Sequence, residues 1–298
     1  MIKRIATAVV LIPIVLLLVL RAPVSLVAIV TAAVALVTVH EFLKLTESYG
    51  VQPLRKPTYG VVVLFFVLLV LNAGQEKPLL STGIFGIAAA FAATIATFVF
   101  LTIAMRRENL STGLPAAAAS AFGFAYIALP LAMLVQLRQQ WAGAFLILYL
   151  LFVVWAGDIF AYFVGRSIGR HLMAPRISPK KTWEGAAASL VASLAIGSAL
   201  FYYSASLSTI LLQWGLIQRR DGMFGLEKPA WVPVLLLTAG LNIAAQLGDL
   251  VESLIKRGAG VKDSGAILPG HGGMLDRIDA LLFAAPVLWF WAAWRVVR

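Results

Sequence analysis

The chain has 298 residues, of which 61% are hydrophobic and 12% are charged. Soluble domains contain roughly 45–50% apolar and about 25% charged residues, so a soluble domain of this composition would lack the polar surface needed to cover its core. The composition therefore excludes an ordinary soluble protein. The absence of cysteine also excludes disulfides, thiolate nucleophiles and cysteine metal ligands.

Apolar segments recur along the whole chain. A membrane-spanning helix needs about 20 mostly apolar residues, and the shorter apolar stretch 206–218 predicts an interfacial or re-entrant helix instead. We predict an all-α, polytopic membrane protein with about nine transmembrane helices, at Ile5–Leu20, Val24–Val39, Thr58–Leu71, Gly83–Met105, Leu114–Leu137, Trp141–Val164, Gly185–Ser204, Trp231–Leu247 and Ala280–Val297. We divide it into N-terminal membrane helices, 1–140, and C-terminal helices with the catalytic motifs, 141–298.

The distribution of lysine and arginine predicts the orientation of these spans. With nine spans, the connections on the N-terminal side carry roughly twice as many cations as those on the other side, which places the N-terminus in the cytoplasm. The two long polar motifs of the chain, at 157–185 and 262–279, then face the cytoplasm. The net charge of +11 is explained by anionic lipid headgroups, so no nucleic acid partner is implied.

Acidic residues are concentrated around the last two spans. Asp249 and Glu252 are three residues apart and Lys256 follows four residues later, so on one helix they share a face. Asp276 and Asp279 repeat the three-residue spacing where the last span begins. Charges at membrane depth are candidates for function, and Asp158 lies within the sixth apolar segment.

The stretch "KDSGAILPGHGGMLDRID", Lys262–Asp279, mixes these acids with cations and glycines. Paired carboxylates bind Mg²⁺ together with substrate phosphates, and lysine and arginine neutralise the remaining phosphate charge. Glycines such as Gly272 and Gly273 let the backbone N–H groups approach phosphate oxygens. The pattern indicates phosphoryl or nucleotidyl transfer.

A second polar block, "GDIFAYFVGRSIGRHLMAPRISPKKTWEG", lies between the sixth and seventh spans. Its glycine and arginine spacing suits a tight turn near anions, although the GxxxG at Gly165 is also typical of helix packing. It contains no Walker A pattern. Its end, "SPKKTWEG", offers four donors for a nucleotide or phosphate: Ser178, Lys180, Lys181 and Thr182.

The stretch "SLIKRGAGVKDSGAILPGHGGMLDRID" resembles the signature of the phosphatidate cytidylyltransferases, or CDP-diacylglycerol synthases, and "QLGDLVES" and the second block resemble the same family. The resemblance covers the second half of the chain. It implies a bacterial inner-membrane enzyme of phospholipid biosynthesis that converts CTP and phosphatidic acid to CDP-diacylglycerol and pyrophosphate with Mg²⁺. It also implies a homodimer and contacts with membrane lipids.

The candidate residues fall into three sets. The metal set is led by Asp249 and Asp276, with Asp158 or Asp279 beside a second cation. The substrate-binding set is Ser178, Lys180, Lys181, Thr182, Gly272 and Gly273. The catalytic set is Lys256, Arg257, Lys262, Asp263, His271 and Arg277.

Several of these assignments have alternatives. His271 either takes a direct role or only donates a hydrogen bond, since a phosphatidate oxygen is already ionised and needs no strong base. Ion pairs could instead join Asp263 to Lys262, Asp279 to Arg277, and Asp158 to Arg166. Competing functions are an ion-coupled transporter, a CTP-dependent lipid kinase such as a polyprenol kinase, and a non-catalytic scaffold.

Overall fold

The computed structural model describes residues 2–73, 82–140, 142–217, 231–267 and 272–297. They form thirteen helical elements and one two-stranded sheet: α1 Ile2–Arg21, α2 Val24–Ser48, α3 Arg55–Asn72, α4 Thr82–Ala104, the 3₁₀ turn η1 Leu110–Thr112, α5 Gly113–Gly123, the π-helical η2 Phe124–Ala128, α6 Leu129–Gln139, α7 Gly143–Ile168, β1 Leu172–Ala174, β2 Ser178–Thr182, α8 Trp183–Tyr202, α9 Ser204–Gln213, α10 Trp231–Gly258 and α11 Leu275–Val297.

Within these residues, eight helical segments are long and apolar enough to cross a membrane, and the apolar part of α1, Val9–Arg21, is a shorter ninth. The prediction of an all-α polytopic membrane protein is confirmed. α9 has ten residues, which at 1.5 Å per residue gives about 15 Å, only half the thickness of a bilayer core. The region predicted to be interfacial or re-entrant thus begins with a helix too short to cross.

α5, η2 and α6 together form one span with a π-helical turn in its middle. Pro130 is the second residue after this turn. Proline has no N–H group and its ring collides with the carbonyl four residues earlier, which here belongs to Tyr126. The wider π-helical turn at Phe124–Ala128 relieves this collision. It also keeps the backbone N–H and C=O groups hydrogen-bonded within the helix, as the bilayer offers them no other partner.

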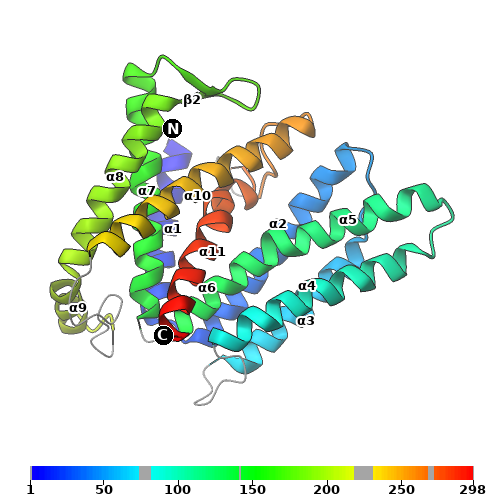
Figure 1. The fold of residues 1–298 in the computed structure, drawn as a ribbon, viewed down its shortest axis with the longest axis horizontal. Coiled ribbons are helices and arrows are strands. Elements are labelled where there is room, and N and C mark those ends of the chain that lie inside the picture. Colours follow the sequence, from blue (N-terminus) through cyan, green and yellow to red (C-terminus); the bar gives the residue numbers. More distant parts are fainter. Residues whose placement is uncertain (1, 74–81, 141, 218–230, 268–271, 298) are drawn as a thin grey trace.

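α11 begins near the middle of the molecule and runs toward the end that carries the C-terminus (Figure 1), and it packs mainly against α10 and α6 and also touches α7 and α4. α7, α8 and α10 pack together on one side of it, and α2, α3, α4 and α5 form the other side. Since α10 and α11 carry most of the predicted acidic residues, their packing brings these residues to the interior of the bundle.

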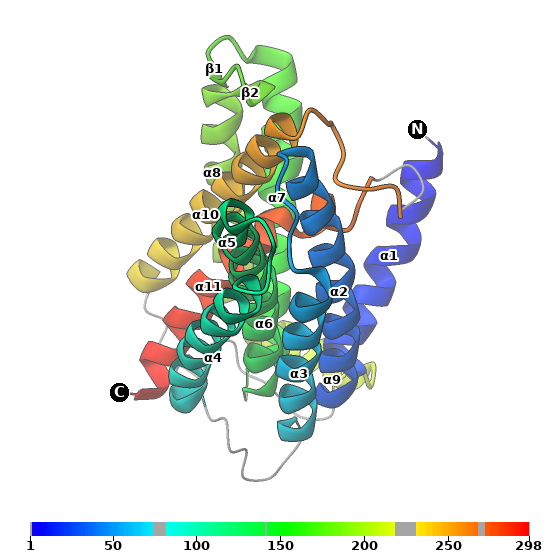
Figure 2. The same cartoon turned by 90° about the vertical axis from the view of Figure 1, so that its right-hand side faces the viewer.

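One end of the bundle carries both polar motifs. The antiparallel hairpin β1–β2 and the end of α10 lie there, whereas α9 and the C-terminus lie at the opposite end (Figures 1 and 2). The second polar block therefore comprises the end of α7, the hairpin and the start of α8, rather than only a tight turn. The hairpin and the end of α10 thus share one end of the bundle, and the side of the membrane that this end faces stays a prediction.

Candidate functional site

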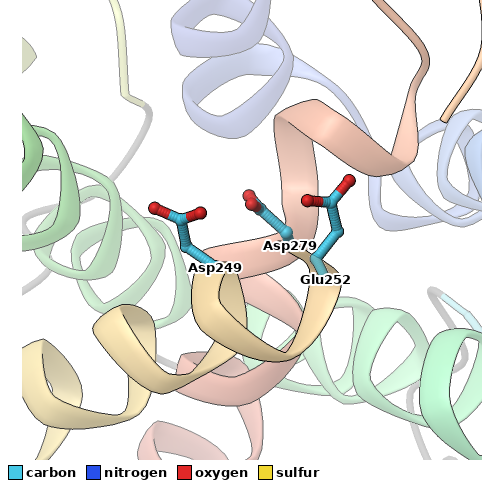
Figure 3. A group of neighbouring side chains, drawn as sticks. All are labelled: Asp249, Glu252 and Asp279. Atoms are coloured by element: carbon cyan, nitrogen blue, oxygen red, sulfur yellow. The ribbon is translucent and has the colours of Figure 1, made fainter. Parts of the chain in front are cut away.

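Three carboxylates meet where α10 crosses α11. Asp249 and Glu252 extend from α10 and Asp279 from α11 (Figure 3), and one oxygen of each lies within 4.8 Å of the other two. Gly248 permits this close crossing, because a Cβ atom there would lie 2.5 Å from the carbonyl oxygen of Asp279. The three-residue spacing on α10 thus produces a shared face, as predicted, and α11 completes the cluster.

Glu252 is the most buried member of the cluster, with 1% of its side chain exposed. The Lys256 ammonium lies 2.6 Å from Oε2 of Glu252, but the geometry is not that of a hydrogen bond, and neither oxygen has a hydrogen-bond partner among the described residues. A buried carboxylate without hydrogen bonds is costly. A hard divalent cation, which prefers oxygen ligands, would give Glu252 a partner, and the neighbouring oxygens of Asp249 and Asp279 could complete such a site.

The hairpin brings a cation to the same cluster. Lys181 on β2 places its Nζ 2.6 Å from Oδ2 of Asp249. A pocket of about 240 Å³ opens beside this pair, and Asp158, Lys180 and Thr182 also line it. The structure therefore joins residues of the second polar block with Asp249 of α10 in one pocket.

Asp158 extends into this pocket from α7. Arg166, its predicted alternative partner, instead donates a hydrogen bond of 2.8 Å from Nη1 to the hydroxyl of Tyr162. Across the part of the chain that the structure describes, no ion pair joins Asp158 to Arg166. The position of Asp158 thus agrees with a role in the pocket.

Thr182 already has a structural partner. Its Oγ1 accepts a hydrogen bond of 3.2 Å from the N–H of Gly185, which makes Thr182 the N-cap of α8. The side chain is buried, and it lies so close to Gly169 that a Cβ atom there would come within 2.7 Å of Oγ1. This threonine therefore holds the hairpin against α7 and α8 as well as lining the pocket.

Asp276 lies outside the cluster of three. Its Oδ1 is 2.6 Å from the ammonium of Lys256, and the carboxylate is 5% exposed. Its Oδ2 accepts hydrogen bonds from the N–H and Oγ of Ser264, both at 2.9 Å, and from the N–H of Gly273 at 2.7 Å. These contacts make Asp276 the anchor of the glycine-containing loop at the start of α11.

Glu41 on α2 is a residue of this site that the sequence analysis did not select. The residue is 3% exposed. Its carboxylate accepts hydrogen bonds from the N–H groups of Met274 at 3.0 Å and Leu275 at 2.9 Å, and from Oγ of Ser264 at 3.2 Å. The first N–H groups of a helix have no partner within the helix, and an acid there is favoured by the helix dipole. Glu41 therefore caps α11 from the N-terminal half of the chain.

The remaining candidates surround this centre. Arg257 donates to the carbonyls of Ile177 at 3.4 Å and Val261 at 3.2 Å, which ties α10 to the hairpin. Gly272 has a φ of +78°, a conformation that favours glycine. Lys262, Asp263 and Arg277 are exposed at the same end of the molecule, Ser178 opens β2, and His271 lies outside the described residues.

Comparisons with known proteins identify the family of the chain. The model of the cytidylyltransferase family matches residues 2–294. Curated relatives named phosphatidate cytidylyltransferase occur in Brucella abortus biovar 1 (strain 9-941), with 42% identity over 182 residues, and in Bacillus subtilis (strain 168), with 42% identity over 148 residues. Another, from Haemophilus influenzae, is 38% identical over 149 residues.

These alignments cover 61%, 50% and 50% of this chain and 57%, 47% and 46% of the respective relatives. The chain thus aligns with about half the length of the curated relatives that it matches. The family model, by contrast, extends over nearly all of it. The chain belongs to the cytidylyltransferase family.

Proposed function

We propose that this membrane protein transfers the cytidylyl group of CTP to phosphatidic acid, giving CDP-diacylglycerol and pyrophosphate for phospholipid synthesis. The observation that carries the proposal is the carboxylate cluster of Asp249, Glu252 and Asp279, flanked by the ammonium groups of Lys181 and Lys256 at one end of the membrane-spanning bundle. Alternating negative and positive groups can bind a metal and phosphates together. The curated relatives carry the name of this activity.

The reaction exchanges one phosphorus–oxygen bond for another. An ionised oxygen of the phosphatidate forms a bond to the α-phosphorus of CTP, and the bond from that phosphorus to the oxygen that bridges to the β-phosphorus breaks. Pyrophosphate leaves with the electron pair. Because the attacking oxygen is already ionised, the residues mainly position the substrates and stabilise charge.

The carboxylate cluster is the proposed magnesium site. Mg²⁺ bound there would neutralise phosphate charge and polarise the phosphoryl group that is transferred. Asp158, in the adjoining pocket, and Asp276, on the far side of Lys256, are the further carboxylates of the proposed metal set. Lys256 bridges Glu252 and Asp276, and we infer that its ammonium group supplies positive charge where a second cation would otherwise be needed.

The hairpin and the loop before α11 are the proposed substrate-binding parts. Lys180 and Lys181 border the pocket and are suited to phosphate oxygens as point charges, with Ser178 and Thr182 beside them. Gly272 and Gly273 precede the start of α11, at the positive end of its dipole, and we propose that their backbone lies close to a phosphate. The N–H of Gly273 donates to Oδ2 of Asp276, so a phosphate that uses this N–H would replace that contact. Arg257, Lys262 and Arg277 are the proposed contacts to the outer phosphates.

We further propose that this end of the molecule and the N-terminus face the cytoplasm of a bacterial inner membrane, and that the enzyme is a homodimer. The chain contains no cysteine, so single cysteines report on topology directly. A cysteine at Arg176 in the exposed hairpin should react with a membrane-impermeant maleimide only after spheroplasts are lysed. A cysteine at Tyr203, which precedes α9, should react in intact spheroplasts.

The activity is tested with purified protein in lipid, CTP, Mg²⁺ and phosphatidic acid. Formation of CDP-diacylglycerol and pyrophosphate in equal amounts, and its loss when EDTA is added, is the expected result. Release of CDP with a phosphorylated lipid would identify a lipid kinase instead. No conversion of CTP by folded protein would contradict the proposal.

A further inference from the structure

A second pocket, of about 450 Å³, lies between α8 and α10. Its walls come from successive turns of the two helices, and nearly all of the lining side chains are apolar: Met173, Trp183, Ala186, Ala187, Leu190, Asn242, Ile243, Gln246, Leu247 and Leu250. This pocket has no part in the reaction described above. Its composition suits a hydrocarbon chain rather than a nucleotide.

The apolar pocket adjoins the polar one. Met173, Ala186 and Gln246 line both. Beyond these three residues, the wall changes from aliphatic side chains to Lys181 and Asp249. A molecule that occupies both pockets needs a charged end for the cations and an apolar tail for the space between α8 and α10.

The two amides in the apolar wall are hydrogen-bonded to neighbouring groups. Asn242 donates from Nδ2 to Oγ of Ser189 and of Ser193, both at 2.8 Å, and its Oδ1 accepts a hydrogen bond of 2.6 Å from Nε2 of Gln246. Ser193 in turn donates to the carbonyl of Val153 on α7. Because this chain satisfies the amide of Asn242, an apolar occupant can pack against it without leaving that group unpaired.

The outer rim of the pocket faces the bilayer. Ile243 is 54% exposed and Leu247 is 49% exposed, and both lie on membrane-spanning α10. Exposed apolar side chains at that depth contact lipid. The pocket is therefore open to a molecule that diffuses within the membrane.

We propose that one acyl chain of the phosphatidic acid substrate occupies the pocket between α8 and α10 while its phosphate lies in the polar pocket beside Lys181. This inference rests on the proposed function and adds where the lipid binds. Since the bilayer is as apolar as the pocket, the chain gains little affinity by entering it. Its binding instead orients the phosphate toward the carboxylate cluster, so loss of the pocket should slow the reaction of the lipid.

Leu190→Trp tests the proposal, because Leu190 lies one helical turn beyond the shared residue Ala186. The bulky ring should fill the far part of the pocket and leave the part near the phosphate open. We expect kcat/KM for dipalmitoyl phosphatidate to fall about tenfold relative to dioctanoyl phosphatidate, with KM for CTP unchanged. Val191→Trp is the matched control, since Val191 is 67% exposed and does not line the pocket. Equal chain-length dependence in both variants would overturn the proposal.

A binding measurement on the wild-type protein separates this proposal from the proposed function. Phosphatidate with a diazirine in its acyl chain is photo-cross-linked in vesicles, and labelled peptides are located by mass spectrometry. Labels on residues 183–190 and 243–250, competed by unlabelled phosphatidate but not by phosphatidylcholine, are expected even if no CDP-diacylglycerol forms. Labels confined to other helices, or competed equally by both lipids, would show that the pocket does not select this substrate.

Discussion

The surroundings of Asp249 and Asp276 differ although the sequence presents the two residues alike. Asp249 has 39% of its side chain exposed and one described ion-pair partner, Lys181, at the edge of a pocket. Asp276 is 5% exposed, and its two oxygens are engaged by Lys256, Ser264 and Gly273. The same residue type is thus available to a ligand in one region and fixes the backbone in the other.

The largest expected effect comes from the open region. Asp249→Asn keeps the size of the side chain but removes its charge, so we expect turnover to fall by about a thousandfold, as when a group that stabilises the transition state is lost. The melting temperature should move by no more than about 2 °C, because partly exposed ion pairs contribute little to stability. Turnover is measured as the rate of CDP-diacylglycerol formation, and the melting temperature by thermal unfolding in detergent.

Glu47→Gln is the matched control for this change. Glu47 lies on α2, away from the carboxylate cluster. Its side chain is 42% exposed, similar to that of Asp249, and it also forms an ion pair, with Arg55 at 2.6 Å. Full activity in this control and none in Asp249→Asn would locate the effect at the site. Near-normal turnover of Asp249→Asn would remove Asp249 from the metal set.

In the buried region, Asp276→Asn should lower stability as well as activity. The change leaves Lys256 without this charged partner and weakens three hydrogen bonds, and breaking a buried ion pair costs about 3–5 kcal/mol. A melting temperature about 10 °C lower is expected, with turnover reduced about a hundredfold. An unchanged melting temperature would contradict the anchoring role.

Binding of Mn²⁺, a paramagnetic substitute for Mg²⁺, sharpens the same comparison. The resemblance predicts that Asp276 is a metal ligand, whereas the structure surrounds its oxygens with donors. If only Asp249→Asn weakens Mn²⁺ binding in electron paramagnetic resonance titrations, Asp276 is structural. Equal weakening in both variants would show that Asp276 gives up Lys256 when the metal binds.

A smaller effect is expected at Glu41. Glu41→Gln retains one oxygen to accept a hydrogen bond at the start of α11 but loses the charge that favours a helix N-terminus, a difference of about 1–2 kcal/mol. We expect a melting temperature roughly 3–5 °C lower and a fall in kcat with little change in KM for CTP. Since Glu47→Gln changes the same residue type on the same helix, an equal loss in that control would contradict a specific role for Glu41.

Glu41 also shows where sequence reasoning reached its limit. The spans were predictable because long apolar runs have few alternatives in a bilayer, and the face shared by Asp249 and Glu252 follows from helical spacing. The contact between Glu41 and Met274 joins residues 233 positions apart, and its donors are backbone N–H groups that leave no sequence pattern. A lone acid at the end of the second apolar run was the one available signal.

The ends of α10 and α11 illustrate the same limit. The predicted spans stop at Leu247 and begin at Ala280, because apolar runs mark the membrane core rather than the helix. The helices extend to Gly258 and from Leu275. The acids therefore lie within regular helices, where the spacing along the chain determines the direction in which each side chain points. Which residue faces each acid depends on how the two helices cross, and the spacing does not give that.

The smallest expected effect is at Thr182, which belongs to the pocket but caps α8. Thr182→Ala should lower stability by about 1 kcal/mol, the usual cost of losing an N-cap, and the melting temperature by about 3 °C. Thr182→Ser keeps the capping oxygen and should restore both stability and KM for CTP. If Thr182→Ala instead raises KM for CTP several-fold while the melting temperature stays unchanged, the hydroxyl binds the nucleotide. Thr182 would then belong with Asp249, which is accessible to a ligand, and not with Asp276, which holds the backbone in place.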